Sequence, residues 1–189
     1  MKKLVFMVVA LATLGLSQAQ TTTVEGVALD NKVTVGESSL MLNGAGLREK
    51  FWIDLYVGGL YLPKKSSNAS SIIAADEDQA IILHIVSKRV TSEKMIDAVN
   101  DGFDAATGGN TKSLDARIKK FTNFFLQDEI KEGDVIVIAN VAGQGIMVMK
   151  NGKNLGTIDG LDFKKALFAI WLGNDPADGD VKDGMLGKS

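Results

Sequence analysis

Few side chains in this sequence could perform chemistry. The chain contains no cysteine and a single histidine, His84. Thiol catalysis, thiolate metal sites and multi-histidine metal centres are therefore excluded. No glycine-rich phosphate loop, nucleophile elbow or His-Glu metal spacing occurs. We accordingly expect no cofactor and no metal.

Arg48 is the charged residue with the clearest potential to bind a ligand. Its guanidinium offers a rigid fork of donors that suits a carboxylate. Tyr56 shares a face of the predicted strand 51–62 with Asp54, and its hydroxyl could complete such a site. The alternative is that Arg48 forms an ordinary ion pair with Glu49 or Asp54.

The remaining polar groups favour structural interpretations. His84 lies in a predicted buried strand, where a hydrogen-bonded core histidine is commoner than a catalytic one. Lys94, in the first turn of a predicted helix, is poorly placed for the helix dipole, but a solvated lysine is favoured over a ligand contact. The acidic segment 175–183 could offer oxygens to calcium; its spacing does not fit an EF-hand, and a solvated turn is favoured.

The N-terminus predicts export. Lys2 and Lys3 precede an apolar run at 4–16, and small residues follow at the positions read by a signal peptidase. We expect cleavage after Ala19, which makes 1–19 a signal peptide and places the mature protein in the periplasm or the medium. The apolar run is shorter than the roughly 20 residues that a membrane-spanning helix needs.

The remaining segment, 20–189, has the length of a single domain. Loss of Lys2 and Lys3 would change the net charge from −2 to about −4. Such a mildly acidic chain lacks the basic footprint of a nucleic-acid-binding protein. We expect no nucleic acid partner and no membrane span after cleavage; the sequence does not determine the oligomeric state.

Hydrophobic periodicity predicts an α+β fold with a largely antiparallel sheet and helices packed on one face. Strands are expected at 23–29, 32–35, 38–42, 51–62, 80–86, 135–139, 145–149 and 153–158. Helices are expected at 68–75, 92–106, 113–126 and 162–172. Asn43-Gly44-Ala45-Gly46 is read as a turn and Asn151-Gly152 as a two-residue hairpin.

Two segments resemble the chalcone isomerases and their relatives. Gly44-Ala45-Gly46-Leu47-Arg48 is similar to the Gly-x-Gly-x-Arg turn of that family, and Tyr56 to Leu62 is similar to the strand that follows it. The order of elements from 24 to 186 also resembles the family. This resemblance implies an open-faced β-sandwich with a cleft between sheet and helices. An exported chain is similar to the bacterial branch of the family rather than to the plant enzymes.

In the plant enzymes an arginine polarises the substrate ketone and steadies the attacking phenoxide, and the resemblance places Arg48 at that position. It places Lys94 at the lysine of the family's Ser-Glu-Lys helix opening. The other polar positions of the family depart from the pattern here, and fall on Tyr56, Thr91, Ala98, Ile170 and Trp171. Loss of several orienting and proton-transferring groups together should abolish useful turnover.

We therefore expect an exported, non-catalytic protein that binds a small amphipathic carboxylate. Plant relatives that bind fatty acids make a fatty acid the leading candidate, by resemblance alone. The expected ligand-binding residues are Arg48, Tyr56, Thr91, Lys94, Ala98, Ile170 and Trp171. The alternatives are an isomerase acting on a chalcone-like or other enone or phenolic substrate, and a scaffold whose cleft is filled by its own side chains.

Overall fold

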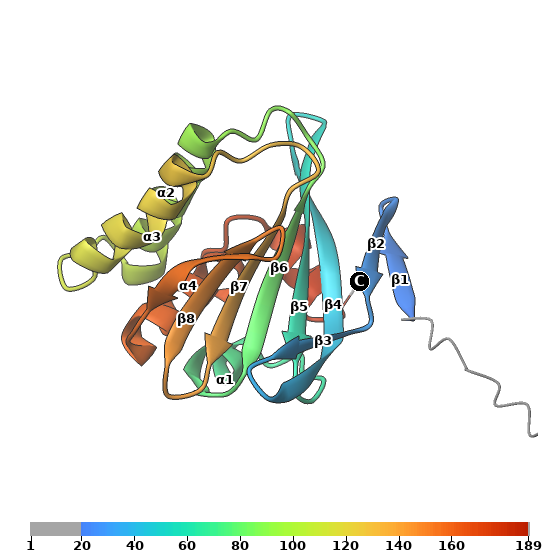
Figure 1. The fold of residues 1–189 in the computed structure, drawn as a ribbon, viewed down its shortest axis with the longest axis horizontal. Coiled ribbons are helices and arrows are strands. Elements are labelled where there is room, and N and C mark those ends of the chain that lie inside the picture. The colour runs from blue at the N-terminus through green and yellow to red at the C-terminus, as the bar shows by residue number, and fades with distance from the viewer. Residues whose placement is uncertain (1–19, 189) are drawn as a thin grey trace, which may run out of the picture.

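A computed structural model describes residues 20–188 of the chain. The predicted signal peptide, 1–19, lies outside the described residues. The fold is built on a seven-stranded antiparallel sheet in which strands adjacent in sequence are adjacent in space (Figure 1). In sheet order the strands are β3 (Lys32–Val35), β4 (Ser38–Lys50), β5 (Ile53–Leu62), β6 (Gln79–Ile85), β7 (Val135–Val141), β8 (Gly145–Lys150) and β9 (Lys153–Ile158).

The helices pack on one face of this sheet, as the hydrophobic patterns predicted. They are α1 (Ala69–Ala74), α2 (Ser92–Thr107), α3 (Asp115–Gln127), α4 (Leu161–Leu172) and α5 (Gly179–Met185). Phe103, Phe121 and Phe163 pack together between the helices with almost no solvent exposure. The expected α+β class, with a largely antiparallel sheet and helices on one face, is confirmed.

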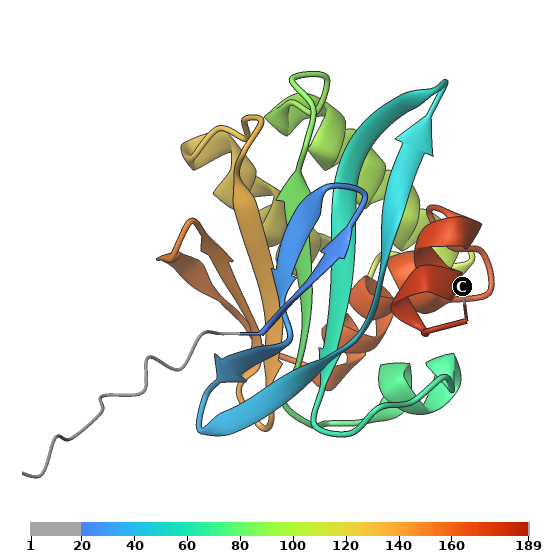
Figure 2. The ribbon, with the colours of Figure 1, turned by 90° about the vertical axis from the view of Figure 1, so that its right-hand side faces the viewer.

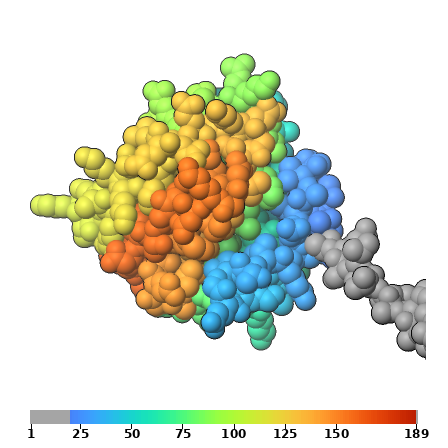
Figure 3. All heavy atoms as spheres, in the orientation of Figure 1, coloured from blue at the N-terminus to red at the C-terminus, as the bar shows by residue number. Residues whose placement is uncertain are grey.

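The N-terminal segment forms a hairpin of its own on the opposite face of the sheet (Figure 2). The expected single strand 23–29 is instead β1 (Thr21–Val24) and β2 (Val27–Asp30), paired in antiparallel fashion. The break falls at Glu25 and Gly26, whose φ angles of 46° and 78° lie in the left-handed region. Leu29 packs with Val57 and Tyr61 in a second, smaller hydrophobic cluster. Figure 3 shows this hairpin, in blue, on the side of the molecule away from α3, in yellow.

The predicted turn at 43–46 is wrong, because β4 continues through it with only a register shift between Leu42 and Gly44. Its glycines serve close packing instead of chain reversal. A Cβ on Gly44 would collide with the carbonyl oxygen of Gly184, and one on Gly46 would come 2.8 Å from the Cα of Val181. Helix α5 therefore lies directly on the backbone of β4, where only glycines leave room for it.

The strand expected at 51–62 begins two residues later than predicted. Lys50 pairs with Ile53, so Phe51 and Trp52 form a two-residue hairpin turn. Both have left-handed φ angles, 53° and 60°. From Tyr56 onward Tyr56 and Leu60 face the helices and Val57 faces the smaller cluster, as expected. Leu55 departs from the expected alternation, because the register shifts there and its side chain packs on the helix side with Tyr56.

Residue types typical of helix ends and hairpin turns occupy those positions in the structure. The hydroxyl of Thr91 accepts a hydrogen bond from the backbone N–H of Lys94 and caps α2, which ends at Gly108 with φ 61°. Asn151 and Gly152 form the predicted hairpin turn between β8 and β9. In the part of the chain that the structure describes, no helix is both long and apolar enough to cross a membrane.

Helix α5 was not expected from the sequence. The acidic segment that contains it reads as a solvated turn, but Asp178 caps the helix by accepting hydrogen bonds from the N–H groups of Asp180 and Val181. Val181 and Met185 on the inner face of the helix are fully buried. Because acidic residues occupy the outer face, the sequence of this segment indicated a solvated turn instead of a helix with a short apolar stripe.

Candidate functional site

A cavity of about 650 Å³ opens between the β4–β5 hairpin, α2 and the C-terminal end of α4. Most of its wall is hydrocarbon, with Leu55, Met95 and Val99 as examples. The size and the apolar lining suit a small organic ligand. The charged residues that line it are Arg48, Lys50, Arg89, Lys94, Asp97, Asp101 and Asp175.

Arg48 lies opposite Tyr56 in the register of β4 and β5. Its guanidinium carbon is 5.8 Å from the centre of the Tyr56 ring, and the residue is half-buried. Within residues 20–188, no carboxylate lies within 4.0 Å of this guanidinium. The ion pair with Glu49 or Asp54 that the sequence left open is therefore not formed, and the charge of Arg48 faces the cavity.

Tyr56 is held in place from the other side by Trp171. The indole N–H of Trp171 donates a hydrogen bond of 3.0 Å to the hydroxyl oxygen of Tyr56, and both side chains are buried. Burial raises the pKa of Tyr56, although the positive charge of Arg48 opposes the shift. Tyr56 therefore keeps its proton at neutral pH, and its O–H can donate to an acceptor in the cavity.

Arg48 and Tyr56 place hydrogen-bond donors of a kind that suits an oxyanion at one end of the apolar wall. A guanidinium and a neutral hydroxyl supply donors to one carboxylate or carbonyl oxygen, and the hydrocarbon wall beside them strengthens each electrostatic contact. Because strands advance about 3.4 Å per residue, this pair lies ~10 Å from the hairpin tip. The geometry suits a ligand with one polar end and an apolar body.

The charges around the cavity are unevenly distributed. The basic residues Lys50, Arg89 and Lys94 come from the hairpin, from the loop before α2 and from the first turn of α2, respectively. The acidic residues Asp97 and Asp101 come from further along α2, and Asp175 follows α4. A ligand anion is thus favoured toward the hairpin end of the cavity.

The structure brings together six of the seven residues expected to bind a ligand. Arg48, Tyr56, Lys94, Ala98, Ile170 and Trp171 all line the cavity. Thr91 does not; its exposed hydroxyl caps α2 instead. That these side chains contact a ligand stays a prediction.

Part of the cavity wall was not identified from the sequence. Met95 and Val99 were not among the expected ligand-binding residues, yet they line the cavity as well as packing in the core. Gly102 adds a close contact: a Cβ there would come 2.7 Å from Cγ2 of Ile170. The sequence of an apolar helix face does not indicate which of its residues border a cavity, because that depends on how α2 crosses α4.

The other polar residues lie elsewhere. His84 on β6 is half-buried opposite Val57, outside the cavity lining, and burial lowers its pKa. Lys164 on α4 is fully buried and donates to the backbone carbonyls of Ile72, Ile73 and Ala75 at the end of α1. Among the residues described, no group of three or more His, Cys, Asp or Glu residues could hold a metal ion.

The fold and the cavity define a chalcone isomerase-like domain. The family model described as chalcone isomerase-like matches residues 21–187, and the chain belongs to this family. A crystal structure of an Arabidopsis thaliana fatty-acid binding protein is similar, with a TM-score of 0.70 and 18% sequence identity. The match covers 88% of this chain and 96% of that one. A comparison with curated protein sequences found no match.

Proposed function

We propose that this protein binds a small amphipathic carboxylate, with a fatty acid as the leading candidate. The carboxylate binds Arg48 and the hydroxyl of Tyr56, and the hydrocarbon chain occupies the cavity between the hairpin and α2. The observation that carries the proposal is a half-buried guanidinium that has no carboxylate partner among residues 20–188, beside a buried neutral tyrosine on an apolar wall.

Two further points support a ligand of this kind. Leaving a cation without a partner beside hydrocarbon is costly, and a ligand carboxylate would remove that cost. The Arabidopsis thaliana protein, which shares the fold, is named a fatty-acid binding protein. The first point concerns this chain's own residues; the second adds only the choice of a fatty acid among carboxylates.

A chalcone isomerase-type reaction is the second candidate. Arg48 and Tyr56 could polarise a carbonyl oxygen as well as bind a carboxylate. Ala98 and Ile170, however, present only hydrocarbon to the same cavity and can neither donate nor transfer a proton. Turnover of a chalcone above the rate of the uncatalysed reaction would establish this candidate over the binding function.

The first test is native mass spectrometry of protein purified from cells, followed by organic extraction of any bound ligand. A co-purifying fatty acid supports the proposal. Delipidated protein should then gain stability when a long-chain acid is added. When the free ligand concentration is one hundred times the dissociation constant, the gain in unfolding free energy is about 2.7 kcal/mol. In a domain of this size, each kcal/mol raises the Tm by about 2–4 °C.

Two variants test whether Arg48, rather than any cation of the cavity, binds the carboxylate. Arg48→Ala should remove most of the thermal shift, since hydrogen bonds to charged groups contribute about 1.5–3 kcal/mol each. Arg89→Ala is the matched control, because it removes an exposed cation from the same cavity. Equal shifts in both variants would contradict the role of Arg48.

Export is the second part of the proposal. It is supported by the pattern of Lys2, Lys3, the apolar run at 4–16 and the small residues ending at Ala19. Intact-mass measurement of the protein from cell fractions tests it. We expect a mature chain that begins at Gln20, outside the cytoplasm; an uncleaved chain in the cytosolic fraction would contradict export.

A further inference from the structure

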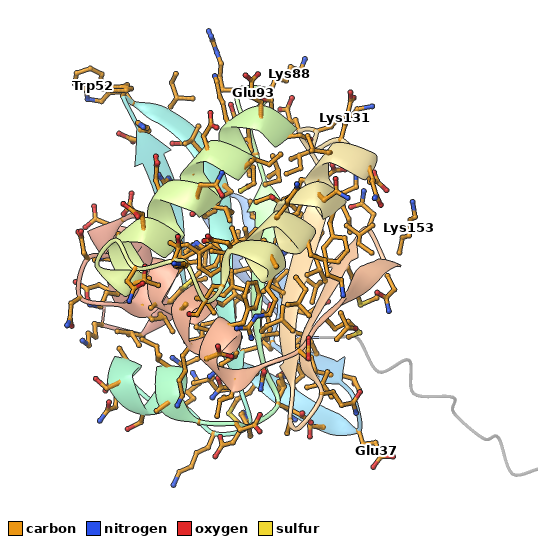
Figure 4. All side chains as sticks on the ribbon, turned by 90° about the vertical axis from the view of Figure 1, so that its left-hand side faces the viewer. Glu37, Trp52, Lys88, Glu93, Lys131 and Lys153 are labelled. Carbon is orange, nitrogen blue, oxygen red and sulfur yellow. The ribbon has the colours of Figure 1, made fainter. Side chains whose placement is uncertain are left out.

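The tip of the β4–β5 hairpin exposes two large aromatic side chains. Phe51 is 78% exposed and Trp52 is 90% exposed, the highest values among the exposed large hydrophobic residues of the described chain. Ile53 beside them is also exposed. Figure 4 shows Trp52 pointing away from the body of the molecule at one end. Side chains of this size are normally buried or covered by a partner.

The backbone at this tip is unfavourable for these residues. Phe51 and Trp52 both adopt left-handed φ angles, 53° and 60°, in a two-residue loop. That combination is typical of a type I′ turn, where Asn-Gly is favoured because bulky residues are strained at positive φ. The fold therefore tolerates local strain while presenting two aromatic rings to solvent. Strain of this kind concentrates at functional positions.

The tip is continuous with the cavity. Lys50, Phe51 and Ile53 line the cavity as well as forming the hairpin end. Whatever the aromatic side chains contact is therefore placed at the opening through which a ligand would enter. An amphipathic carboxylate of low solubility resides mostly in lipid. This link between the opening and lipid rests on the proposed function.

We propose that Phe51 and Trp52 insert into the surface of a lipid bilayer and place the cavity opening against it. Tryptophan and phenylalanine partition into the boundary between headgroups and acyl chains. A convex tip of two residues can enter lipid without a complementary surface. A stable protein partner would instead need a contact of about 800 Å² on each side, which a two-residue tip cannot provide.

The charges near the tip suit a zwitterionic headgroup. Lys50 and Arg89 carry positive charge close to the opening, whereas Glu49 and Asp54 flank the hairpin with negative charge. Figure 4 shows Lys88 and Glu93, whose side chains carry opposite charges, at the same end of the molecule as Trp52. A mixed surface of this kind matches the phosphate and ammonium groups of phosphatidylcholine, so the aromatic residues are expected to dominate attachment.

The test uses delipidated full-length mature protein and phosphatidylcholine vesicles, without added fatty acid. We expect the protein to float with the vesicles in a density gradient. Tryptophan emission should shift to shorter wavelength on binding. Because Trp171 is buried but lines the cavity, a variant that lacks Trp52 measures how much of the shift comes from Trp171. Absence of both flotation and shift would overturn the proposal.

A double variant separates membrane contact from folding. Phe51→Asn with Trp52→Gly creates the turn sequence that the backbone prefers, so the Tm should be unchanged or higher. Flotation should nevertheless fall at least tenfold. Leu126→Ser is the matched control, because Leu126 is an exposed apolar residue on α3, 63% exposed, and its loss should leave flotation unchanged. Equal flotation of the double variant and the native protein would overturn the proposal.

Two other outcomes are informative. If the native protein stays in the soluble fraction but dimerises, and the double variant does not, the tip contacts a second copy of the chain and the proposal is wrong. Vesicle binding is measured without fatty acid, so it is independent of the proposed function. Flotation by a protein that binds no fatty acid would support the membrane contact and contradict only the ligand.

Discussion

The indole N–H of Trp171 donates a 3.0 Å hydrogen bond to the hydroxyl of Tyr56, and this contact joins α4 to β5 at the wall of the cavity. The two residues are far apart in sequence, and both are buried. The bond occupies the acceptor side of the tyrosine oxygen and leaves its hydrogen for a ligand.

This hydrogen bond should be measurable by a double-mutant cycle. Tyr56→Phe leaves the buried indole N–H unpaired, and Trp171→Phe leaves the hydroxyl without its donor. Each change should cost about 1–3 kcal/mol of unfolding free energy, with a coupling of about 1 kcal/mol between them. Chemical denaturation of the two single variants and the double variant gives these values; strictly additive losses would show that the bond contributes nothing.

The contact between α5 and β4 predicts a strong effect of a single methyl group. Gly184→Ala would drive a Cβ into the backbone of Ala45 and Gly46, where neither partner can move aside. We expect a loss of about 2–4 kcal/mol, in the range of disruptive core changes.

Gly179→Ala is the control for that variant. Gly179 begins the same helix, but a Cβ there would meet nothing within 4 Å. Its replacement by alanine should be neutral or slightly stabilising. Thermal unfolding of both variants tests the packing. Because alanine favours a helix more than glycine does, a Gly184→Ala variant as stable as the native protein would contradict the close contact with β4.

Lys164 should be more important for stability than its neighbour Lys165. Its ammonium group donates to three backbone carbonyls and lies 4.6 Å from the ring centre of Phe168. Lys164→Met leaves those carbonyls without their donor at the end of α1, for a loss of about 2–4 kcal/mol. Lys165→Met, at an exposed position, should change stability by less than about 0.5 kcal/mol.

The same lysine predicts a dependence of stability on pH. Burial lowers the pKa of Lys164 to about 8, below the value of about 10.4 in an unfolded chain. Between these values the unfolded state binds more protons, so the contribution of Lys164 makes stability rise with pH over this window. Lys164→Met should remove this component of the slope. An identical pH profile for the variant would contradict the shift.

The two tyrosines predict that stability falls with rising pH, which is opposite to the effect of Lys164. Burial raises the pKa of Tyr61 to about 12 and raises that of Tyr56 as well, whereas unfolded tyrosine titrates near 10. The native state therefore holds these protons more tightly, and stability falls as pH rises above about 10. Absorbance at 295 nm should show little phenolate in native protein at pH 10.5, and substantial phenolate in denaturant. Normal titration of both residues in the folded protein would contradict their burial.

Much of the fold was predictable because its signals are local. Large residues on both faces indicated β5, a short apolar run indicated the buried strand β6, and the Asn151-Gly152 pair predicted a hairpin. Each of these depends on residues within one element or one turn. The sequence therefore predicted the α+β class and the order of the elements.

Glycines and acidic residues misled the prediction for a physical reason. Gly44 and Gly46 look like a turn, but their lack of a Cβ serves contact with a helix more than a hundred residues away in the chain. The acidic segment after 174 looks solvated, although Val181 and Met185 bury its inner face. Close packing between distant segments leaves no local pattern.

For the candidate site, the residue types available for chemistry could be read from the sequence alone: one conspicuous arginine, no thiol and no histidine cluster. The resemblance supplied the positions to examine. The three-dimensional structure was needed to show that no carboxylate within residues 20–188 pairs with Arg48, that Trp171 bonds to Tyr56, and that a cavity lies beside them. These facts depend on how α2, α4 and the hairpin approach one another, because burial and pairing are set by contacts between elements.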